Sequence, residues 1–264
     1  MSEMWYGAAL GIVQGLTEFL PVSSSGHLIV FSWFTDGKPI PLALDVALHL
    51  GTLGAVAAYF FRDWLQMGQS VWQAIRFRQL SFEVKTLLPA LLLGTIPIGL
   101  LGVLFKDPIE LYFHRPAVVA IPLAVVGLIL WIVDRRSPQV RSLEQVTLRD
   151  GILIGLCQCA ALVPGVSRSG STIIAGRLLG LRRADAAKLS FLMGTPAMTG
   201  AVLLESKHIL AHLHEPVFFM GIGVSFAVGC FAIALLLKIL GTRDLGIFAV
   251  YRILVAIFIW SMVR

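Results

Sequence analysis

The stretch Pro21-Val22-Ser23-Ser24-Ser25-Gly26-His27 places a polar turn inside an otherwise apolar segment. A second stretch of the same kind, Pro164-Gly165-Val166-Ser167-Arg168-Ser169-Gly170-Ser171, lies far along the chain. Upstream of each stands a matching Gly-x-x-Gln, at Gly11–Gln14 and at Gly155–Gln158. Because both the polar turn and the Gly-x-x-Gln before it occur twice, the sequence indicates an internal repeat. We predict that the polar residues lie where the two copies meet.

The composition is that of an integral membrane protein. Of 264 residues, 57% are hydrophobic and only 14% are charged, and the mean hydropathy is +0.85. Soluble domains carry roughly 25% charged residues. The first eight residues lack the basic region of a cleavable signal peptide, so we expect the N-terminus to be retained. The three cysteines are not spaced as a disulfide framework, and we expect no thiol chemistry.

About six apolar segments are long enough to cross a bilayer, which takes about 20 apolar residues. They are roughly 42–61, 87–105, 117–133, 187–204, 217–237 and 246–263. Two further apolar stretches, 5–34 and 150–180, are interrupted near the middle by Pro, Ser and Gly. Such backbone is tolerated at membrane depth only where protein or a cavity surrounds it. We therefore interpret both stretches as re-entrant helical hairpins with tips near the midplane.

The distribution of basic residues predicts the orientation. They are concentrated in four loops, at 62–86, 134–149, 180–188 and 238–245. If each hairpin enters and leaves on one side, these loops share a side, which the positive-inside rule makes cytoplasmic. Both termini then lie outside, and the two hairpins enter from opposite sides.

The sequence therefore predicts an all-α polytopic membrane protein with an inverted-topology repeat. We expect a single domain over residues 1–264, with one repeat of about 1–133 and a second of about 150–264. The net charge of +6 is explained by the basic loops, and no basic run with interleaved aromatic residues is present. We expect no nucleic-acid partner.

The two polar turns have the chemistry of an anion site. Each second half-helix would begin directly after its turn, with free N–H groups and the positive end of a helix dipole. Arg168 offers a planar guanidinium suited to phosphate, and Gly26 and Gly170 allow close backbone approach. Hydroxyl donors are supplied by Ser23, Ser24, Ser25, Ser167, Ser169, Ser171 and Thr172. We expect a site for phosphate or diphosphate; helix packing by small residues is the alternative, but it leaves an intramembrane Arg unexplained.

Residues of the first turn could add hydrolysis to binding. Ser24 and His27 are three apart and would share a helix face, so His27 could be a base for Ser24 or attack phosphorus itself. Glu18 lies one turn beyond Gln14, and its carboxylate could orient His27, hold a divalent cation or carry protons. The alternative is that Glu18 is the buried partner that neutralises Arg168.

Other polar residues in apolar segments support weaker hypotheses. Asp45 and His49 are one turn apart near the end of a predicted helix, and we interpret them as interface residues, with a role at the lipid entrance as the alternative. Arg177 is expected to reach the cytoplasmic interface by snorkelling. Arg252 is expected to do the same or to pair with a carboxylate. The tract 62–86 predicts an amphipathic interfacial helix.

These residues also carry a resemblance. Gln14 to His27 is similar to the [Glu/Gln]-x-x-x-Glu plus Pro-Val-Ser-Ser-x-Gly-His signature of the undecaprenyl-diphosphate phosphatase family, also called the bacitracin resistance protein family. Pro164 to Thr172 resembles its second signature, Pro-Gly-x-Ser-Arg-Ser-x-x-Thr. The order of the signatures, the length and the hydropathy match over essentially the whole chain.

The resemblance implies a hydrolase of the bacterial inner membrane that removes the terminal phosphate of undecaprenyl diphosphate at a site facing the periplasm. This recycles the carrier lipid for peptidoglycan synthesis, cell wall biogenesis and cell shape, and confers resistance to the antibiotic bacitracin. Carried over by position, the functional residues are Gln14, Glu18, Ser24, His27, Ser167 and Arg168. We add Ser23, Ser25, Gly26, Ser169 and Thr172 as substrate-binding groups. Many members have Glu where this chain has Gln14, which puts in doubt a metal shared by two carboxylates.

In the expected mechanism, Arg168 and both half-helix N-termini clamp the diphosphate while Ser24, activated by His27, attacks the terminal phosphorus. His27 as nucleophile, or as base for water, is the alternative. Glu18 could hold Mg²⁺ or Ca²⁺ bridging the phosphates. A different class of protein, an alternating-access transporter or flippase of a lipid phosphate, would share the inverted repeat with broken helices. The choice between monomer and homodimer is left open by the sequence.

Overall fold

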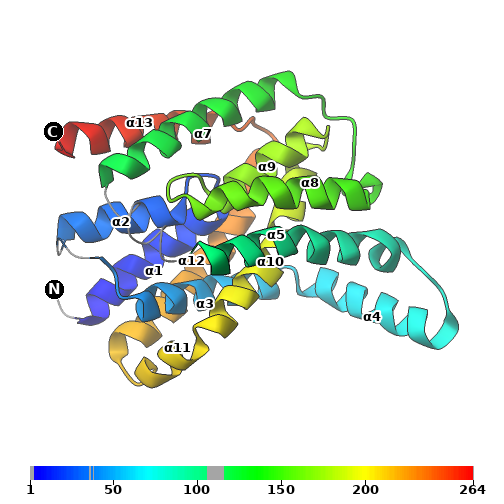
Figure 1. Ribbon diagram of the computed structural model, residues 1–264, viewed down its shortest axis with the longest axis horizontal. Coiled ribbons are helices and arrows are strands. Elements are labelled where there is room, and N and C mark those ends of the chain that lie inside the picture. Colours follow the sequence, from blue (N-terminus) through cyan, green and yellow to red (C-terminus); the bar gives the residue numbers. More distant parts are fainter. Residues whose placement is uncertain (1–2, 36, 38, 106–115, 264) are drawn as a thin grey trace.

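The computed structural model describes residues 3–35, 37, 39–105 and 116–263, and its regular elements in these ranges are helices, together with one isolated bridge between Arg141 and Leu181 (Figure 1). The α-helices are α1 (Glu3–Phe19), α2 (Ser24–Thr35), α3 (Leu42–Tyr59), α4 (Phe61–Phe77), α5 (Leu88–Leu104), α7 (Pro116–Arg136), α8 (Leu148–Gln158), α9 (Arg168–Leu178), α10 (Arg183–Leu204), α11 (Ser206–His212), α12 (Pro216–Leu240) and α13 (Gly246–Val263). A π-turn (Glu83–Leu87) precedes α5, and 3₁₀ turns lie at Leu143–Gln145 and Cys159–Leu162.

Six of these helical segments are long and apolar enough to cross a membrane. Within the described residues they are Leu42–Tyr59, Glu83–Leu104, Pro116–Arg136, Arg183–Leu204, Pro216–Leu240 and Gly246–Val263. Their bounds follow the six predicted segments, because a span needs about 20 apolar residues at the helical rise and each loop is marked by polar residues. The prediction of an all-α, multi-pass membrane protein is confirmed.

Both interrupted stretches form two helices joined by a tight turn. The turn between α1 and α2 ends at Ser23 with φ 77°, and the turn before α9 ends at Ser167 with φ 78°. The Ser23 hydroxyl accepts from the Gly26 N–H (3.4 Å), and the Ser167 hydroxyl accepts from the Gly170 N–H (3.0 Å). The shift along the sequence that takes Ser23 to Ser167 also takes Gly26 to Gly170. Each new helix therefore begins after a serine that has a positive φ and whose hydroxyl caps the helix.

The turn-containing pairs reverse the direction of the chain. Figure 1 shows α1 running from the N-terminus toward the middle of the molecule and α2 returning toward the end where both termini lie. α8 starts near the opposite end, and α9 turns back toward that end after the second break. The two breaks consequently lie in the interior, which puts their polar residues between the surrounding long helices.

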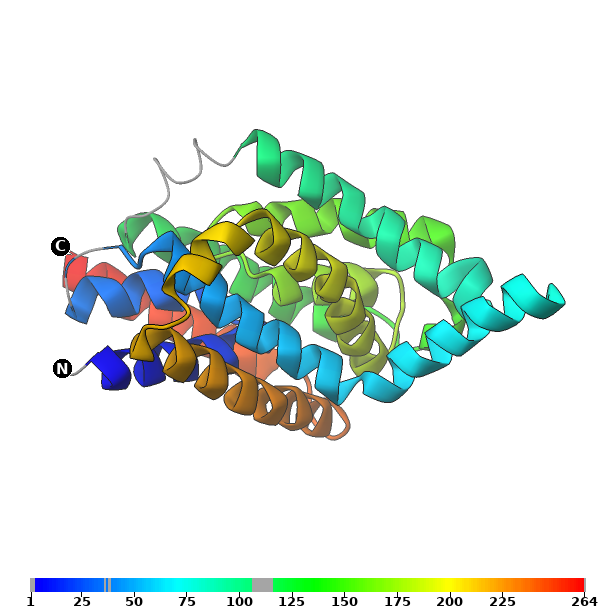
Figure 2. The same cartoon turned by 90° about the horizontal axis from the view of Figure 1, so that it is seen from below.

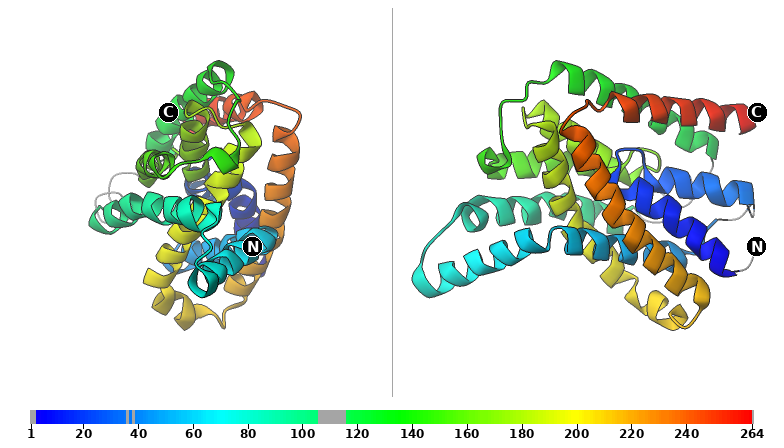
Figure 3. Two further views of the ribbon diagram at one scale, coloured as in Figure 1. Left: turned by 90° about the vertical axis from the view of Figure 1, so that its right-hand side faces the viewer. Right: turned by 180° about the vertical axis from the view of Figure 1, so that it is seen from behind.

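Each broken helix packs against a long helix from the other half of the chain. α1 lies along α12, as the view from behind in Figure 3 shows, and α8 lies along α5. Glycines make these crossings close. A Cβ added at Gly11 would lie 2.9 Å from the Gly221 carbonyl oxygen, and one at Gly151 would lie 2.5 Å from Cβ of Ala90. The two halves are thus interleaved through small-residue contacts of the kind that membrane helices use.

The basic loops meet at the end opposite the termini. Asp134 at the end of α7 pairs with Arg177 (3.0 Å) and Arg183 (2.8 Å) and accepts the Leu245 N–H (2.9 Å). Arg177 also donates to four backbone carbonyls and has no exposed surface. The expectation that Arg177 snorkels to the interface is therefore wrong, because Asp134 supplies a partner inside the protein.

α4 projects from this end, beyond the other helices (Figure 2). Asp63 in the first turn of α4 pairs with Lys188 of α10 (2.5 Å). Trp72, Ile75 and Phe77, toward the far end of α4, are exposed. The predicted amphipathic helix within 62–86 is present.

Candidate active site

The two turns, which we call the first tip (residues 20–27) and the second tip (residues 163–171), touch each other. The Ser169 hydroxyl donates to the Leu20 carbonyl across 3.0 Å. A Cβ added at Gly26 would lie 3.5 Å from Cα of Gly165. Residues about 150 positions apart are brought together, as the repeated motif predicts.

Glu18, at the end of α1, is the centre of the polar cluster between the tips. Its Oε1 accepts from Nη2 of Arg168 (2.8 Å), and its Oε2 accepts from Oγ of Ser24 (2.7 Å) and Nε2 of Gln14 (3.1 Å). The Glu18 side chain is 6% exposed and that of Arg168 is 12% exposed. An ion pair this far from solvent holds both charges in a medium where each alone would be costly. The pairing of Glu18 with Arg168, which the sequence offered as the alternative, is present, and Ser24 and Gln14 join it.

Arg168 is the first residue of α9, and the hydroxyls that follow support its backbone. Its Nη1 donates to the Ser190 carbonyl on α10 (3.1 Å). Ser171 and Thr172 donate back to the Arg168 carbonyl (2.9 Å each), and the Thr172 hydroxyl also lies 2.7 Å from that of Ser190. Thr172, expected to bind substrate, instead contacts its own helix and α10 in this arrangement.

Both ring nitrogens of His27 have partners other than Ser24. One ring nitrogen lies 2.7 Å from the Ser23 carbonyl, and the other lies 2.9 Å from the Tyr251 hydroxyl of α13. The rings of His27 and Tyr251 are stacked, with centroids 5.6 Å apart. The expected Ser24–His27 pair is thus replaced by Ser24–Glu18, because the end of α1 brings a charged acceptor to the first hydroxyl of α2 and both His27 ring nitrogens have other partners.

His49, interpreted from the sequence as an interface residue and not as part of the site, lies beside Glu18. Its Nε2 is 3.6 Å from Oε2 of Glu18, and its Nδ1 is 2.9 Å from the Asp45 carbonyl and 3.8 Å from the Asp45 carboxylate. α3 therefore brings two titratable groups, His49 and Asp45, to the carboxylate of Glu18. A His at one-turn spacing from an Asp was the only signal, and it could not reveal that α3 packs across α1.

The remaining serines pair with each other within each tip. Ser23 and Ser25 hydroxyls are 3.3 Å apart, and those of Ser167 and Ser169 are 3.1 Å apart. Both pairs stand at the N-terminal ends of helices, where backbone N–H groups and the helix dipole favour an anion. Neighbouring hydroxyls can turn their hydrogens outward when an anion arrives, so both tips can act as donors.

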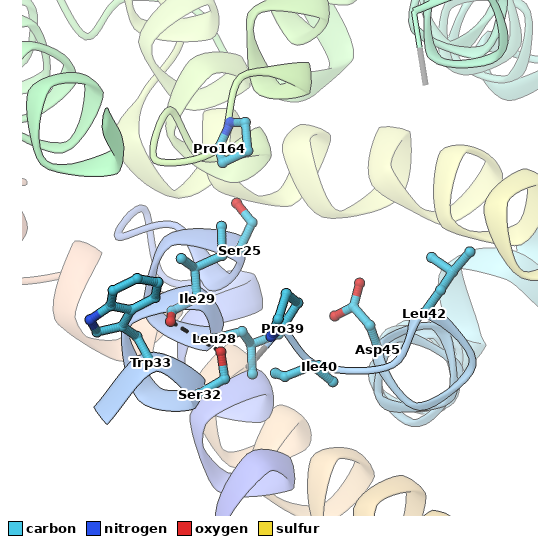
Figure 4. A pocket seen from close by; sticks show the side chains of 10 residues that line it. All are labelled: Ser25, Leu28, Ile29, Ser32, Trp33, Pro39, Ile40, Leu42, Asp45 and Pro164. Carbon is cyan, nitrogen blue, oxygen red and sulfur yellow. Dashed lines mark hydrogen bonds between the residues drawn. The ribbon is translucent and has the colours of Figure 1, made fainter. Parts of the chain in front are cut away.

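A cavity of about 420 Å³ opens at the tips between α2 and α3. Ser25 of the first tip and Pro164 of the second lie toward one another at this cavity, and Trp33 lies farther along α2 (Figure 4). Its lining consists of Ser25, Leu28, Ile29, Ser32, Trp33, Pro39, Ile40, Leu42, Asp45 and Pro164. A mostly apolar passage ending at hydroxyls suits an amphipathic molecule with a polar head.

The cluster fits a resident divalent cation poorly. Both Glu18 oxygens already accept hydrogen bonds, and the Arg168 guanidinium is 2.8 Å away. Oε1 of Gln14 is buried without a hydrogen-bond partner in the described part of the chain, but the described residues contain no group of three or more His, Cys, Asp or Glu side chains placed to hold a metal ion. Mg²⁺ and Ca²⁺ require several oxygen ligands. The expected ligand role of Glu18 is not supported by this geometry.

The fold and the cluster together define a multi-pass membrane protein with a charged, hydroxyl-rich site between two broken helices. The chain belongs to the bacitracin resistance protein BacA family, whose family model matches residues 7–258. It is 46% identical to the undecaprenyl-diphosphatase of Thermomicrobium roseum, over 95% of each chain. It is 44% identical to the undecaprenyl-diphosphatase of Gemmatimonas aurantiaca, over 98% of this chain and 97% of that protein.

Proposed function

We propose that this protein is an undecaprenyl-diphosphatase, which hydrolyses undecaprenyl diphosphate to undecaprenyl phosphate and inorganic phosphate. Family membership and the names of relatives at 44–46% identity support this activity. The observation that carries it is the Ser24–Glu18–Arg168 contact, which joins a hydroxyl, a carboxylate and a guanidinium between two helix N-termini. In a bacterium, this reaction returns the carrier lipid to peptidoglycan synthesis and opposes bacitracin.

In the proposed complex, the diphosphate lies at the tips and competes with Glu18 for Arg168. The guanidinium is planar and can hold phosphate oxygens in the way that it now holds a carboxylate oxygen. The N–H groups at the starts of α2 and α9 add donors. The prenyl chain extends along the apolar cavity beside α2.

We assign the nucleophile to Ser24 and the proton acceptor to Glu18. Oγ of Ser24 bonds to the terminal phosphorus as the bridging P–O bond breaks, its proton passes to Glu18, and undecaprenyl phosphate leaves. The oxygen of a water molecule then bonds to the phosphorus as the bond to Oγ of Ser24 breaks, Glu18 returns its proton to that Oγ, and inorganic phosphate leaves while the second water proton passes to solvent. Ser24 is favoured over His27 because both His27 ring nitrogens are occupied by Ser23 and Tyr251. Arg168 opposes the charge that develops on the phosphoryl oxygens.

A divalent cation, expected from the sequence, is proposed only as a companion of the diphosphate oxygens. Glu18 is engaged by Arg168 and Ser24, so no protein-held cation is assigned a step. Removal of free cations with EDTA and their restoration with Mg²⁺ or Ca²⁺ tests this assignment. If the cation enters with the substrate, EDTA should abolish phosphate release and added Mg²⁺ or Ca²⁺ should restore it. The KM for the lipid should then depend on the cation concentration.

The same proposal includes an inverted repeat with re-entrant hairpins and a site that faces the periplasm. Two observations support the repeat: α1 packs on α12 as α8 packs on α5, and Ser23 and Ser167 cap their helices with nearly the same φ. The basic loops gather at the end remote from the termini, which supports a cytoplasmic position for that end. The orientation is tested by placing single cysteines near Glu3 and near Arg243 and labelling intact cells. A thiol reagent that does not cross the membrane should label the first cysteine, and the second should be labelled only by a reagent that crosses it.

The activity is tested by measuring inorganic phosphate released from a long-chain polyprenyl diphosphate by purified protein in detergent. Wild type should release phosphate, and the Ser24→Ala, Glu18→Gln and Arg168→Ala variants should not. A detergent solution has no compartments, so a transporter of lipid phosphate would bind the lipid without releasing phosphate. Saturable binding without release by wild type would therefore overturn the enzyme and favour the transporter.

A further inference from the structure

Arg252 on α13 is fully buried and joins both tips through their backbones. Its Nη1 donates to the Pro21 carbonyl of the first tip (2.9 Å), and its Nη2 donates to the Gly165 carbonyl of the second (2.7 Å). Nε donates to the Leu123 carbonyl of α7 (3.1 Å). Its hydrogen-bond acceptors in the described part of the chain are all backbone carbonyls. The expectations of snorkelling or of pairing with a carboxylate are both wrong for Arg252.

The two carbonyls held by Arg252 are equivalent positions of the repeated motif. The shift along the sequence that takes Ser23 to Ser167 also takes Pro21 to Gly165. One guanidinium therefore binds the equivalent carbonyl of both turns, with one terminal nitrogen donating to each. This arrangement depends on the planar fork of Arg, since the single ammonium of Lys cannot present parallel donors to two carbonyls.

The charge of Arg252 has an electrostatic partner in the two helix ends. α1 ends at Phe19 just before Pro21, and the 3₁₀ turn that continues α8 ends at Leu162 just before Gly165. Helix C-terminal ends carry partial negative charge, and cations there are stabilised. The half-helices that follow, α2 and α9, start at Ser24 and Arg168, so their positive ends lie at the polar cluster. Arg252 thus places a cation at carbonyls that follow the negative ends of the two incoming helices.

We propose that Arg252 is a positioning residue that fixes the two tips relative to each other, so that Ser24 on one tip and Arg168 on the other act on the same phosphorus. Arg252 takes this role from behind the turns, without contact to substrate. The inference rests on the proposed phosphatase activity for its kinetic part, and its structural part stands independently of that activity. A charge buried this deeply in a membrane protein is costly, so a function beyond helix packing is expected for it.

Arg177 provides a matched control for burial and chemistry. It too is completely buried and donates to backbone carbonyls, but it ties α9 to the basic loops through Asp134. A change from Arg to Lys at either position removes the same guanidinium fork from a fully enclosed site. If buried arginines only stabilise the fold, both changes should have the same kind of effect.

The first measurement compares the kinetics of Arg252→Lys, Arg252→Gln and Arg177→Lys with wild type, at equal amounts of folded protein. Both Arg252 variants should lower kcat about a hundredfold, the loss expected when reacting groups are displaced by about 1 Å, with a much smaller change in KM. Arg177→Lys should lower the thermal unfolding temperature and leave kcat close to wild type. Retained kcat in both Arg252 variants, or an equal loss in Arg177→Lys, would overturn the proposal.

The second measurement is amide hydrogen exchange of peptides covering residues 18–28 and 162–172, without substrate. Arg252→Lys should speed exchange in both peptides together, and Arg177→Lys should not. Unchanged exchange at both tips, or a rise at only one tip, would refute the linkage. Because this readout needs no turnover, a wild-type protein that releases no phosphate would remove the proposed function while the exchange data still decide the role of Arg252.

Discussion

Arg168 and Glu18 form an ion pair of 2.8 Å between the start of α9 and the end of α1. The pair places a carboxylate beside the guanidinium at a point where two helix N-termini favour an anion. In the proposed complex, a phosphate group takes the place at Arg168 that Glu18 holds in the free protein. Substrate binding would then exchange one anion for another at Arg168, while Glu18 keeps its contact with Ser24.

The exchange predicts opposite effects on binding and on turnover. Glu18→Gln removes the competing negative charge, so a non-hydrolysable polyprenyl diphosphonate should bind more tightly than to wild type. The same variant should release no phosphate, because Ser24 loses its proton acceptor. Calorimetric or fluorescence titration in detergent measures the affinity, with Asp150→Asn as a remote carboxylate control that leaves it unchanged. Weaker binding to Glu18→Gln would contradict the competition.

The stability of the pair can be separated from its role in activity. Arg168→Met leaves Glu18 buried without its cation, which should lower the free energy of unfolding by about 3–5 kcal/mol. The double variant Glu18→Gln with Arg168→Met should recover most of that loss, because neither charge is then left alone. Denaturant unfolding in mixed micelles provides the comparison. Activity should stay absent in the double variant, and recovery of turnover would count against Arg168 as a phosphate ligand.

Gly194 on α10 is expected to control the position of the Arg168 side chain. A Cβ at Gly194 would overlap the guanidinium, which is the far end of a flexible side chain. Gly194→Ala should therefore push Arg168 away from Glu18 and reduce phosphate release by at least tenfold, since small displacements at a reacting site are costly. Thermal stability should change little. Gly200→Ala on the same helix, where the added Cβ meets nothing within 4 Å, is the matched control with wild-type activity.

Ser167 combines a left-handed backbone with a capping hydroxyl. At φ 78° a Cβ is strained, whereas the hydroxyl bond to the Gly170 N–H stabilises the start of α9. Ser167→Ala keeps the strain and loses the cap, at a cost of about 1 kcal/mol. Ser167→Gly loses the cap and relieves the strain, so it should be more stable than Ser167→Ala. Thermal unfolding of the two variants checks the order, and the reverse order would show that the backbone is not strained there.

Asp150, at the start of α8, gives the fold a dependence on pH. Burial alone would raise the pKa of Asp150, but hydrogen bonds from Arg141 and Thr147 outweigh it and hold the pKa below its ordinary value. A lowered folded-state pKa stabilises the protein above the unfolded pKa of roughly 4, and this contribution is lost as pH falls through the lowered value. Unfolding temperatures measured from pH 7 downward should show this loss. Asp150→Asn should be less stable than wild type at pH 7, and its unfolding temperature should fall less as the pH is lowered.

The sequence was sufficient for the spans and for the meeting of the two tips, because hydropathy and a repeated motif depend on the chain alone. It was not sufficient for the partners of individual side chains. Ser24 and His27 share a spacing of three, but Glu18 and Tyr251 compete for them, and both competitors are positioned by packing. His49 joins the cluster only because α3 crosses α1. Arg177 and Arg252 find acceptors in distant loops and turns, which no local pattern reveals.

The packing of α1 against α12 has a consequence for the order of assembly. About 200 residues separate Phe19 from the start of α12, so at roughly 5–20 residues per second the ribosome needs on the order of 10–40 s to make the partner of α1. During that interval the glycine face of α1 lacks the helix against which it finally packs. α8, by contrast, emerges when α5 is already in place. The first hairpin is therefore the part of the chain most in need of protection while the protein is being inserted into the membrane.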